Sequence, residues 1–111
     1  MFIAPVKKIL AITAVAAIAA ALAIPAFAAT KTARVTDRGF SPATVSIHAG
    51  DTIKWVWSGK KQHQVFQVGG PGHFHSPPHT GRGTFKHRFT KRGTYKFVDP
   101  YSSKYQVIKV K

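Results

Sequence analysis

The sequence predicts one all-β domain, a Greek-key sandwich of about seven short strands, placed after an N-terminal export signal. Residues 29–111 contain short alternating runs rich in Val, Ile, Thr and aromatic residues, and turn residues separate these runs. The same region shows almost no helical periodicity. The composition of residues 1–28 differs from the rest of the chain and separates the signal from the domain.

The first 28 residues have the parts of an export signal. Lys7 and Lys8 precede an apolar stretch over residues 9–24, which is followed by Pro25 and the small-x-small sequence of residues 26–28. Cleavage after Ala28 is expected to release a domain of residues 29–111 to the periplasm or the cell exterior. The alternative is an uncleaved membrane anchor, but the apolar stretch is shorter than the roughly 20 residues that span a bilayer.

The expected strands cover residues 32–36, 44–48, 52–57, 63–68, 84–89, 94–98 and 105–110. Turns are expected at Gly50 and Gly93, because glycine accepts the positive φ that tight turns need. His48 is expected to face solvent, and His87 to lie in the core or at a sheet edge. Alternation along the strands assigns the following side chains to the core: Val45, Ile47, Ile53, Trp55, Trp57, Phe85, Phe89, Tyr95, Phe97, Ile108 and Val110.

The composition restricts the function classes. Residues 29–111 carry 15 Lys and Arg against three Asp, a net charge of +12, which attracts anionic envelope polymers, lipid head groups or acidic proteins. The alternative is a surface that is basic for solubility alone. The chain has no cysteine, so no disulfide holds the domain together. With three acidic side chains and no pattern of nucleophile, base and acid, we expect no enzymatic activity.

The connection over residues 69–83 is rich in glycine and proline, so no regular structure is expected there. His73, His75 and His79 lie in it. In an extended segment His73 and His75 project to the same side, so they could share one metal ion that His79 or His63 completes. Imidazole binds Cu(II), Zn(II) and Ni(II), with Cu(II) favoured. The alternative is that these histidines are ordinary polar surface residues.

The order of short motifs resembles the cupredoxin family, the plastocyanin-like blue-copper proteins, over nearly all of residues 29–111. The matching segments are GFSP at 39–42, VSIHAGDTIKW at 45–55, QHQV at 62–65, GTF at 83–85, Phe89 and GTYKF at 93–97. The resemblance implies a β-sandwich with a copper site. In that family one ligand is a mid-domain histidine, and a C-terminal loop supplies a cysteine, a second histidine and a methionine.

The copper ligands that this resemblance implies are mostly missing. The first histidine falls on His63, and the nearest alignment places Val98 at the cysteine, Tyr101 at the second histidine and Tyr105 at the methionine. An alignment shifted by one residue places Asp99 at the cysteine instead. Because a thiolate–copper bond cannot form, the blue colour and tuned potential are not expected. We expect Tyr105 to fill the emptied pocket, and leave the role of Tyr101 open.

Three functions therefore compete. The first is an exported module that binds copper, or zinc, through the histidines His63, His73, His75 and His79. The second is a metal-free basic interaction domain for an anionic partner of the cell envelope. The third and weakest is electron transfer, which rests on the resemblance alone. Trp55 and Trp57 could stack on bases or sugars, but on a sheet face they are more often core residues.

Overall fold

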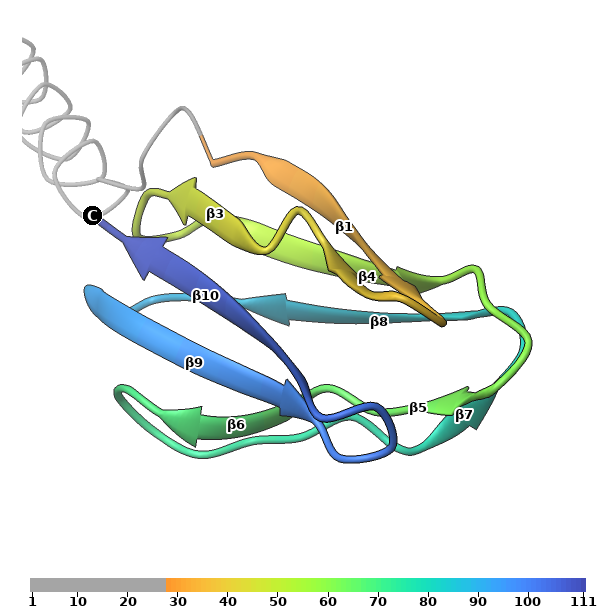
Figure 1. Ribbon diagram of the computed structural model, residues 1–111. Helices are drawn as coiled ribbons and strands as arrows, with labels where there is room; N and C mark the ends of the chain where they lie inside the picture. The colour runs from red at the N-terminus through yellow and green to blue at the C-terminus, as the bar shows by residue number, and fades with distance from the viewer. Residues whose placement is uncertain (1–27) are drawn as a thin grey trace, which may run out of the picture.

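A computed structural model describes residues 28–111, which form a two-layer β-sandwich (Figure 1). Ten strands and no helix lie in this range, so the all-β prediction is confirmed. The predicted export signal lies outside the described residues, apart from its final residue. Within the described range no helix has the length and apolar character needed to cross a membrane.

The strands are β1 (Thr30–Thr36), β2 (Gly39–Ser41), β3 (Thr44–Ile47), β4 (Thr52–Trp57), β5 (Gln62–His63), β6 (Phe66–Gly69), β7 (His79–Thr80), β8 (Gly83–Arg88), β9 (Gly93–Asp99) and β10 (Lys104–Val110). Each long strand starts and ends within two residues of its predicted range, because the alternation of buried and exposed side chains defines it. The chain reverses at Gly50, whose φ of 99° favours glycine, as predicted.

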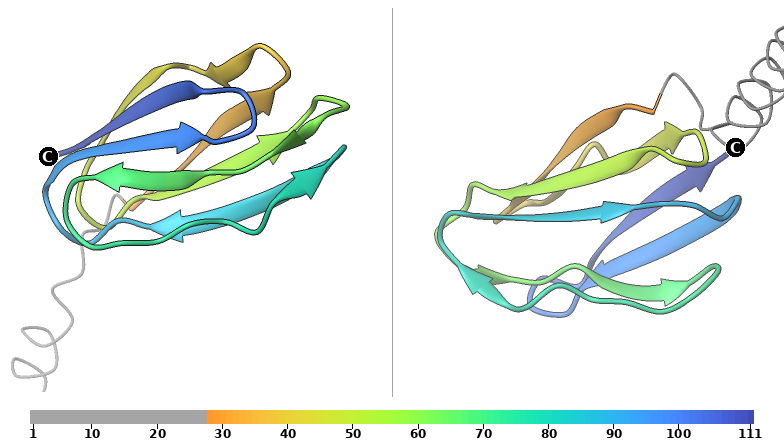
Figure 2. Two further views of the ribbon diagram at one scale, coloured as in Figure 1. Left: turned by 60° about the horizontal axis from the view of Figure 1, so that its bottom comes forward. Right: turned by 180° about the vertical axis from the view of Figure 1, so that it is seen from behind.

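Two four-stranded sheets form the layers of the sandwich (Figure 2). The first, called sheet A, has the order β2-β1-β4-β8, and the second, called sheet B, has the order β3-β10-β9-β6. β1 pairs with β4 in parallel, and β3 pairs with β10 in parallel, while the other neighbours are antiparallel. The short strands β5 and β7 pair separately at one end of the sandwich. Strands distant in the sequence therefore become neighbours in both sheets.

The core lies between the sheets and centres on Trp55, whose ring meets Phe97 edge-on with centroids 5.5 Å apart. The predicted core residues are all buried except Phe85, which is half-buried against the same cluster. Full burial of such large apolar side chains contributes roughly 1.5–3 kcal/mol each. The core also contains Ala33, Val35, Phe40 and Val65, which the sequence pattern did not assign to it.

Two buried glutamines join the apolar core to the backbone. The indole nitrogen of Trp55 donates to Gln106 Oε1 at 2.8 Å, and Gln106 Nε2 donates to the carbonyl of Pro42 at 2.8 Å. Gln67 Nε2 donates to the carbonyl of Pro71 at 2.9 Å. Among residues 28–111 no buried side-chain nitrogen or oxygen lacks a hydrogen-bond partner. The buried polar side chains of the described residues are therefore paired within the protein itself.

Two expectations about the middle of the chain are corrected. The single strand expected over 63–68 is divided into β5 and β6, because Val65 N donates to Ser76 Oγ at 2.9 Å instead of to a neighbouring strand. The connection over residues 69–83 contains β7 and a bridge between Phe66 and His75, so part of it is regular. Its Phe74 side chain turns into the core and stacks on His87 with ring centroids 3.8 Å apart.

Candidate functional site

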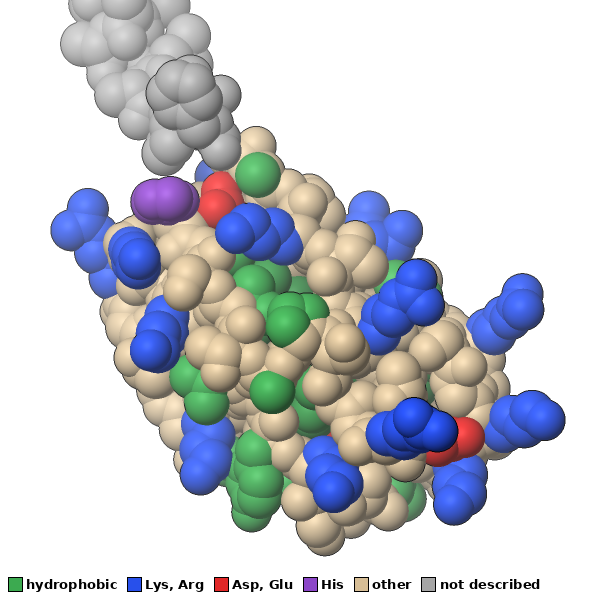
Figure 3. Space-filling view, turned by 45° about the horizontal axis from the view of Figure 1, so that its top comes forward, with side chains coloured by type: hydrophobic (Ala, Val, Ile, Leu, Met, Phe, Trp, Pro, Cys, Tyr) green, Lys and Arg blue, Asp and Glu red, His purple; other side chains and the backbone are tan. Residues whose placement is uncertain are grey.

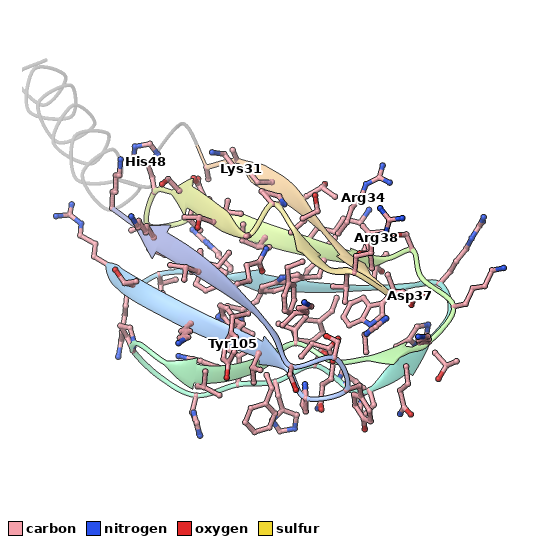
Figure 4. The ribbon with its side chains drawn as sticks, in the orientation of Figure 1. Lys31, Arg34, Asp37, Arg38, His48 and Tyr105 are labelled. Atoms are coloured by element: carbon pink, nitrogen blue, oxygen red, sulfur yellow. The ribbon has the colours of Figure 1, made fainter. Side chains whose placement is uncertain are left out.

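The imidazole of His63 lies between two carboxylates at one end of the sandwich. His63 ends β5, Asp99 ends β9, and Asp37 lies in the turn between β1 and β2, where Figure 4 labels it. His63 Nδ1 is 2.6 Å from Asp99 Oδ2, and His63 Nε2 is 2.8 Å from Asp37 Oδ1. We call this group the acid–histidine triad. His63 therefore lies close to the end of β9, where the β9–β10 loop begins.

The inner carboxylate, Asp99, is almost completely buried and fully hydrogen-bonded. Its Oδ1 accepts from the backbone N–H groups of Gln64 at 3.1 Å and Tyr101 at 3.0 Å. Its Oδ2 accepts from Ser102 Oγ at 2.8 Å as well as facing His63. These donors hold the carboxylate in place, because a charge in the interior must be paired and hydrogen-bonded.

The outer carboxylate, Asp37, is about one-third exposed and joins the same histidine to the sheet edge. Its pKa is lowered from 3.8 to about 2, first by the hydrogen bond with His63 and then by the backbone N–H groups of Lys60 and Lys61. Gly59 lies directly against the Asp37 carboxylate, so that any Cβ at residue 59 would collide with it. The absence of a side chain at Gly59 is therefore what allows Asp37 to approach.

The geometry of the triad defines how His63 bonds. A carboxylate offers acceptors, and an imidazole ring offers a donor at each nitrogen that carries a proton. Both ring nitrogens of His63 lie within hydrogen-bond distance of a carboxylate oxygen, so the ring bridges Asp99 and Asp37. Since His63 is buried and the triad draws on β5, β9 and the β1–β2 turn, it joins sheet A to sheet B at this end.

These residues do not fit the thiolate copper centre that the family resemblance implies. The chain has no cysteine, and its one methionine is Met1. A metal ion bound to both His63 Nδ1 and Asp99 Oδ2 at tetrahedral angles would hold those atoms roughly 3.3 Å apart, given metal–ligand bonds of about 2 Å. They are 2.6 Å apart, which is the separation of a charge-assisted hydrogen bond.

The structure distributes the four predicted histidine ligands over separate surroundings. His75 stacks on Phe66 with ring centroids 5.2 Å apart, and His73 is exposed beside a hollow. His79 pairs with His63 in the β5–β7 register, but its Nε2 bonds to the carbonyl of Arg82. Within residues 28–111 no group of three His, Cys, Asp or Glu side chains is placed to hold a metal ion. Binding of a metal through these histidines stays a prediction.

The structure places the residues assigned to the former ligands in different surroundings. Of the two residues weighed for the cysteine position, Asp99 is buried and faces His63, whereas Val98 is half-buried on the other side of β9, and the correspondence of either residue to the cysteine stays a prediction. Tyr105 is 53% exposed, and the expectation that it fills the pocket is wrong. The reason is alternation: Gln106 and Ile108 point into the core, which turns Tyr105 outward. Tyr101 is 52% exposed in the β9–β10 loop and contributes its backbone N–H to Asp99.

Asp37 and Asp99 are the site residues that sequence reasoning missed as partners of His63. Asp37 is 26 residues from His63, and Asp99 is 36 residues away. The sequence did contain a signal that could have identified these two residues. The chain has three acidic residues, and a charged side chain at the end of a core strand needs a partner.

The outward side of sheet A forms a second candidate site. Cross-strand register places Lys54 directly opposite Lys86, with Thr32 on the other side of Lys54. Figure 3 shows that, on the side of the molecule in view, Lys and Arg side chains are spread widely with little acidic surface between them. We call this side of the sheet the basic face, and its side chains are Thr30, Thr32, Arg34, Thr52, Lys54, Val56, Thr84, Lys86 and Arg88.

The basic face continues into a shallow hollow of about 560 Å³ between the ends of β4 and β8. The hollow is lined by Val56, Trp57, Ser58, Arg82, Gly83 and Thr84. Arg34 pairs with Val56 in the β1–β4 register and projects outward, as does Arg38 in the neighbouring turn (Figure 4). Guanidinium groups beside hydroxyl groups suit a carboxylate, sulfate or phosphate.

Comparison with known proteins identifies the fold of the domain. No protein-family model matches the chain. The structure is similar to a purple cupredoxin from Nitrosopumilus maritimus, with a TM-score of 0.65 and 21% identity over 73% of this chain and 99% of that one. It is also similar to a mutant of amicyanin in the Cu(I) state, with a TM-score of 0.67 and 17% identity over 74% of this chain and 82% of that one.

A copper-containing nitrite reductase from Thermus scotoductus SA-01 gives a TM-score of 0.65 at 21% identity, and 74% of this chain matches 22% of that one. The chain therefore has the cupredoxin fold, as its motifs predicted. Within that fold, the acid–histidine triad lies at the end of the sandwich where β5, β9 and the β1–β2 turn meet.

Proposed function

We propose that this protein is an exported cupredoxin-fold domain that works without a metal ion and binds a polyanion through its basic face. The observation that carries the proposal is the unbalanced charge of that face. Its Arg34, Lys54, Lys86 and Arg88 side chains have no acidic neighbour on the face. A net charge of +12 over residues 29–111 strengthens the attraction for any polyanion.

The placement of Lys54 opposite Lys86 supports a binding role over a role in stability alone. Like charges directly opposite in neighbouring strands destabilise a sheet. A surface that is basic only for solubility would gain from an acidic residue at one of these positions. The surrounding threonines supply hydroxyl donors, and the outward side of a four-stranded sheet gives an extended ligand room to lie across several strands.

The acid–histidine triad supports the metal-free part of the proposal. Both ring nitrogens of His63 are engaged by carboxylates, so neither is free to bind a metal without breaking a short hydrogen bond. The solved structures that resemble this chain include proteins named for copper or Cu(I), and their fold is shared here. In this chain the triad itself links the β1–β2 turn of sheet A to β9 of sheet B.

The test compares two charge reversals of equal size. Lys54→Glu with Lys86→Glu alters the basic face, and Lys91→Glu with Arg92→Glu alters the exposed β8–β9 turn. We expect the first pair to weaken heparin binding at least about tenfold and to lower the salt dependence of the affinity, because fewer counterions are released. The second pair should have a much smaller effect. Equal losses in both variants, or no heparin binding by the parent protein, would overturn the proposal.

A titration with Cu(II) and Zn(II) tests the metal-free part separately. An ion that binds only the native state raises the melting temperature of the protein by mass action. We expect no rise at neutral pH with either ion. A rise that disappears in the variant His73→Ala with His75→Ala would instead establish the loop histidines as a metal site, and a rise lost in His63→Ala would place the metal at the triad.

A further inference from the structure

The residue that leads into the sandwich, Ala29, is held by two backbone hydrogen bonds just before β1 begins. Its carbonyl accepts from the backbone N–H of Thr52 at 2.9 Å. Its backbone nitrogen donates to the side chain of Asp51, at 2.9 Å from Oδ1. Ala29 itself is exposed. The two bonds attach the start of the domain to the point where the β3–β4 turn becomes β4.

The carboxylate of Asp51 is 4% exposed, yet its close partners are neutral backbone groups. Besides the Ala29 nitrogen, the backbone N–H of His48 donates to Oδ2 at 2.9 Å. Among residues 28–111, the cationic group within 4 Å is the side chain of His48, whose Nδ1 lies at 3.9 Å and which is 83% exposed. Lys31, labelled with His48 in Figure 4, donates its ammonium to the carbonyl of Ser46 at 2.7 Å instead. A buried carboxylate of this kind gains from a cation placed directly against it.

The predicted export signal ends at the residue before Ala29. The small-x-small sequence of residues 26–28 predicts cleavage after Ala28 by a signal-processing peptidase. Hydrolysis breaks the amide bond between the Ala28 carbonyl carbon and the Ala29 nitrogen. Water supplies the hydroxyl group of the new carboxylic acid and one hydrogen for the new amine. The amine then takes up the proton that the acid releases, because an α-amino group is mostly protonated at neutral pH.

We propose that Asp51 is the binding site for the α-ammonium group of Ala29, which cleavage after Ala28 creates. The inference uses the export that the proposed function includes and adds a step that follows export. The nitrogen already lies 2.9 Å from Asp51 Oδ1, so the ion pair forms with the backbone in place. Cleavage replaces a neutral amide donor by a charged one, and charge-assisted hydrogen bonds are about twice as strong. Processing of the chain therefore stabilises the folded domain.

The geometry selects one cleavage position. Cleavage one residue later removes Ala29 together with its bonds to Asp51 and Thr52. Cleavage at an earlier residue leaves the Ala29 nitrogen in a neutral peptide bond. Cleavage after Ala28 places the positive charge on the atom that contacts Asp51. The sequence motif and the position of the buried carboxylate are independent observations, and both point to the same bond.

The first test determines where the exported protein begins. The full chain is produced in a bacterial host, and the protein recovered after export is examined by N-terminal sequencing and intact mass. We expect Ala29 as its first residue. A different first residue, or a chain that keeps residues 1–28, would overturn this inference. Heparin binding by the basic face tests the proposed function separately, so the two failures can be told apart.

The second test measures the ion pair in urea unfolding at neutral pH. Residues 29–111 contain both sheets and the core, so this domain can be made by chemical synthesis with Ala29 carrying either a free amine or an acetyl group. Acetylation restores the neutral amide of the uncleaved chain. We expect the unfolding equilibrium constant of the free-amine form to be about fivefold to tenfold smaller, above the range of exposed ion pairs because Asp51 is buried.

The overall charge of the domain predicts the opposite result. Side chains of residues 29–111 already give a net charge of +12, so a further positive charge without a local partner should destabilise the fold by self-repulsion. Two controls locate the effect. In Asp51→Asn the free amine should give no advantage over the acetylated form. A chain that begins at Ala28 carries the same charge one residue away and should be no more stable than the acetylated form. Equal stability of the free and acetylated parent forms, or an advantage that persists in either control, would overturn the proposal.

Discussion

The acid–histidine triad gives a sharp prediction for stability. Replacing His63 by Leu leaves the Asp99 carboxylate buried and without its imidazole partner. Removing one partner of a buried ion pair costs roughly 3–5 kcal/mol. Asp99 keeps three donors, from Gln64, Tyr101 and Ser102, so we expect a loss of about 3 kcal/mol, near the lower end. Replacing Asp99 by Asn keeps an acceptor for those donors and should cost about 1–2 kcal/mol.

The double variant separates a real pair from two independent losses. Once Asp99 is Asn, no uncompensated charge remains when His63 becomes Leu, so the double variant should be more stable than the two single losses predict. We expect a coupling of about 1.5–3 kcal/mol, within the range seen for residues in one hydrogen-bond network.

The assay is urea unfolding at neutral pH, followed by the fluorescence of Trp55 and Trp57. Both are buried, and the indole nitrogen of Trp57 donates to the carbonyl of His63 at 3.1 Å, so the signal reports on this end of the sandwich. Losses that add within about 0.5 kcal/mol would refute the coupling and with it the structural role of the triad. The variant Asp51→Asn removes an acid outside the triad. It tests whether the loss of any aspartate gives the same coupling with His63→Leu.

Three further predictions follow from the same end of the molecule. Because the Asp37 pKa is lowered from 3.8 to about 2, its contribution to stability is present above about pH 4 and lost as the pH falls toward 2. In Asp37→Asn the urea midpoint should fall less steeply than in the parent protein as the pH is lowered. The slope that remains comes from Asp51, whose pKa is also lowered by backbone hydrogen bonds. An unchanged slope would contradict this prediction. Gly59→Ala should destabilise the protein, because the added Cβ meets the Asp37 carboxylate. The control Gly69→Ala should be tolerated, because its Cβ meets Lys96 at 3.5 Å. Thermal unfolding compares the two variants. Tyr105→Ala should change the free energy of unfolding by less than about 1 kcal/mol, since the side chain is half exposed, and a larger loss in urea unfolding would show that Tyr105 packs into the fold.

Much of the fold follows from local patterns. Alternation over residues 52–57 and 94–98 assigned Ile53, Trp55, Trp57, Tyr95 and Phe97 to the core, and all five are buried. The positive φ at Gly50 matches the expected turn. The short-motif order predicted the cupredoxin fold, because the spacing of strands and turns reflects the sandwich. These features depend on neighbours close in the sequence.

Other features depend on which segments meet. The strand β7 and the bridge from His75 to Phe66 lie inside a connection whose glycines and prolines predicted no regular structure. The sequence also did not reveal that Gln106 bonds to Trp55, since the two residues lie on different sheets. Such partners become visible once the sheets are packed together.

The sequence alone determined the charge of the domain, the lack of a cysteine and the choice of His63 as a site residue. The partners of His63 were decided by the tertiary structure. The alternation that places Tyr95 and Phe97 in the core also turns Asp99 inward, but local alternation does not reveal that Asp99 meets His63 of β5. Asp37 reaches the same imidazole because the β1–β2 turn lies against Gly59, where no side chain keeps it away.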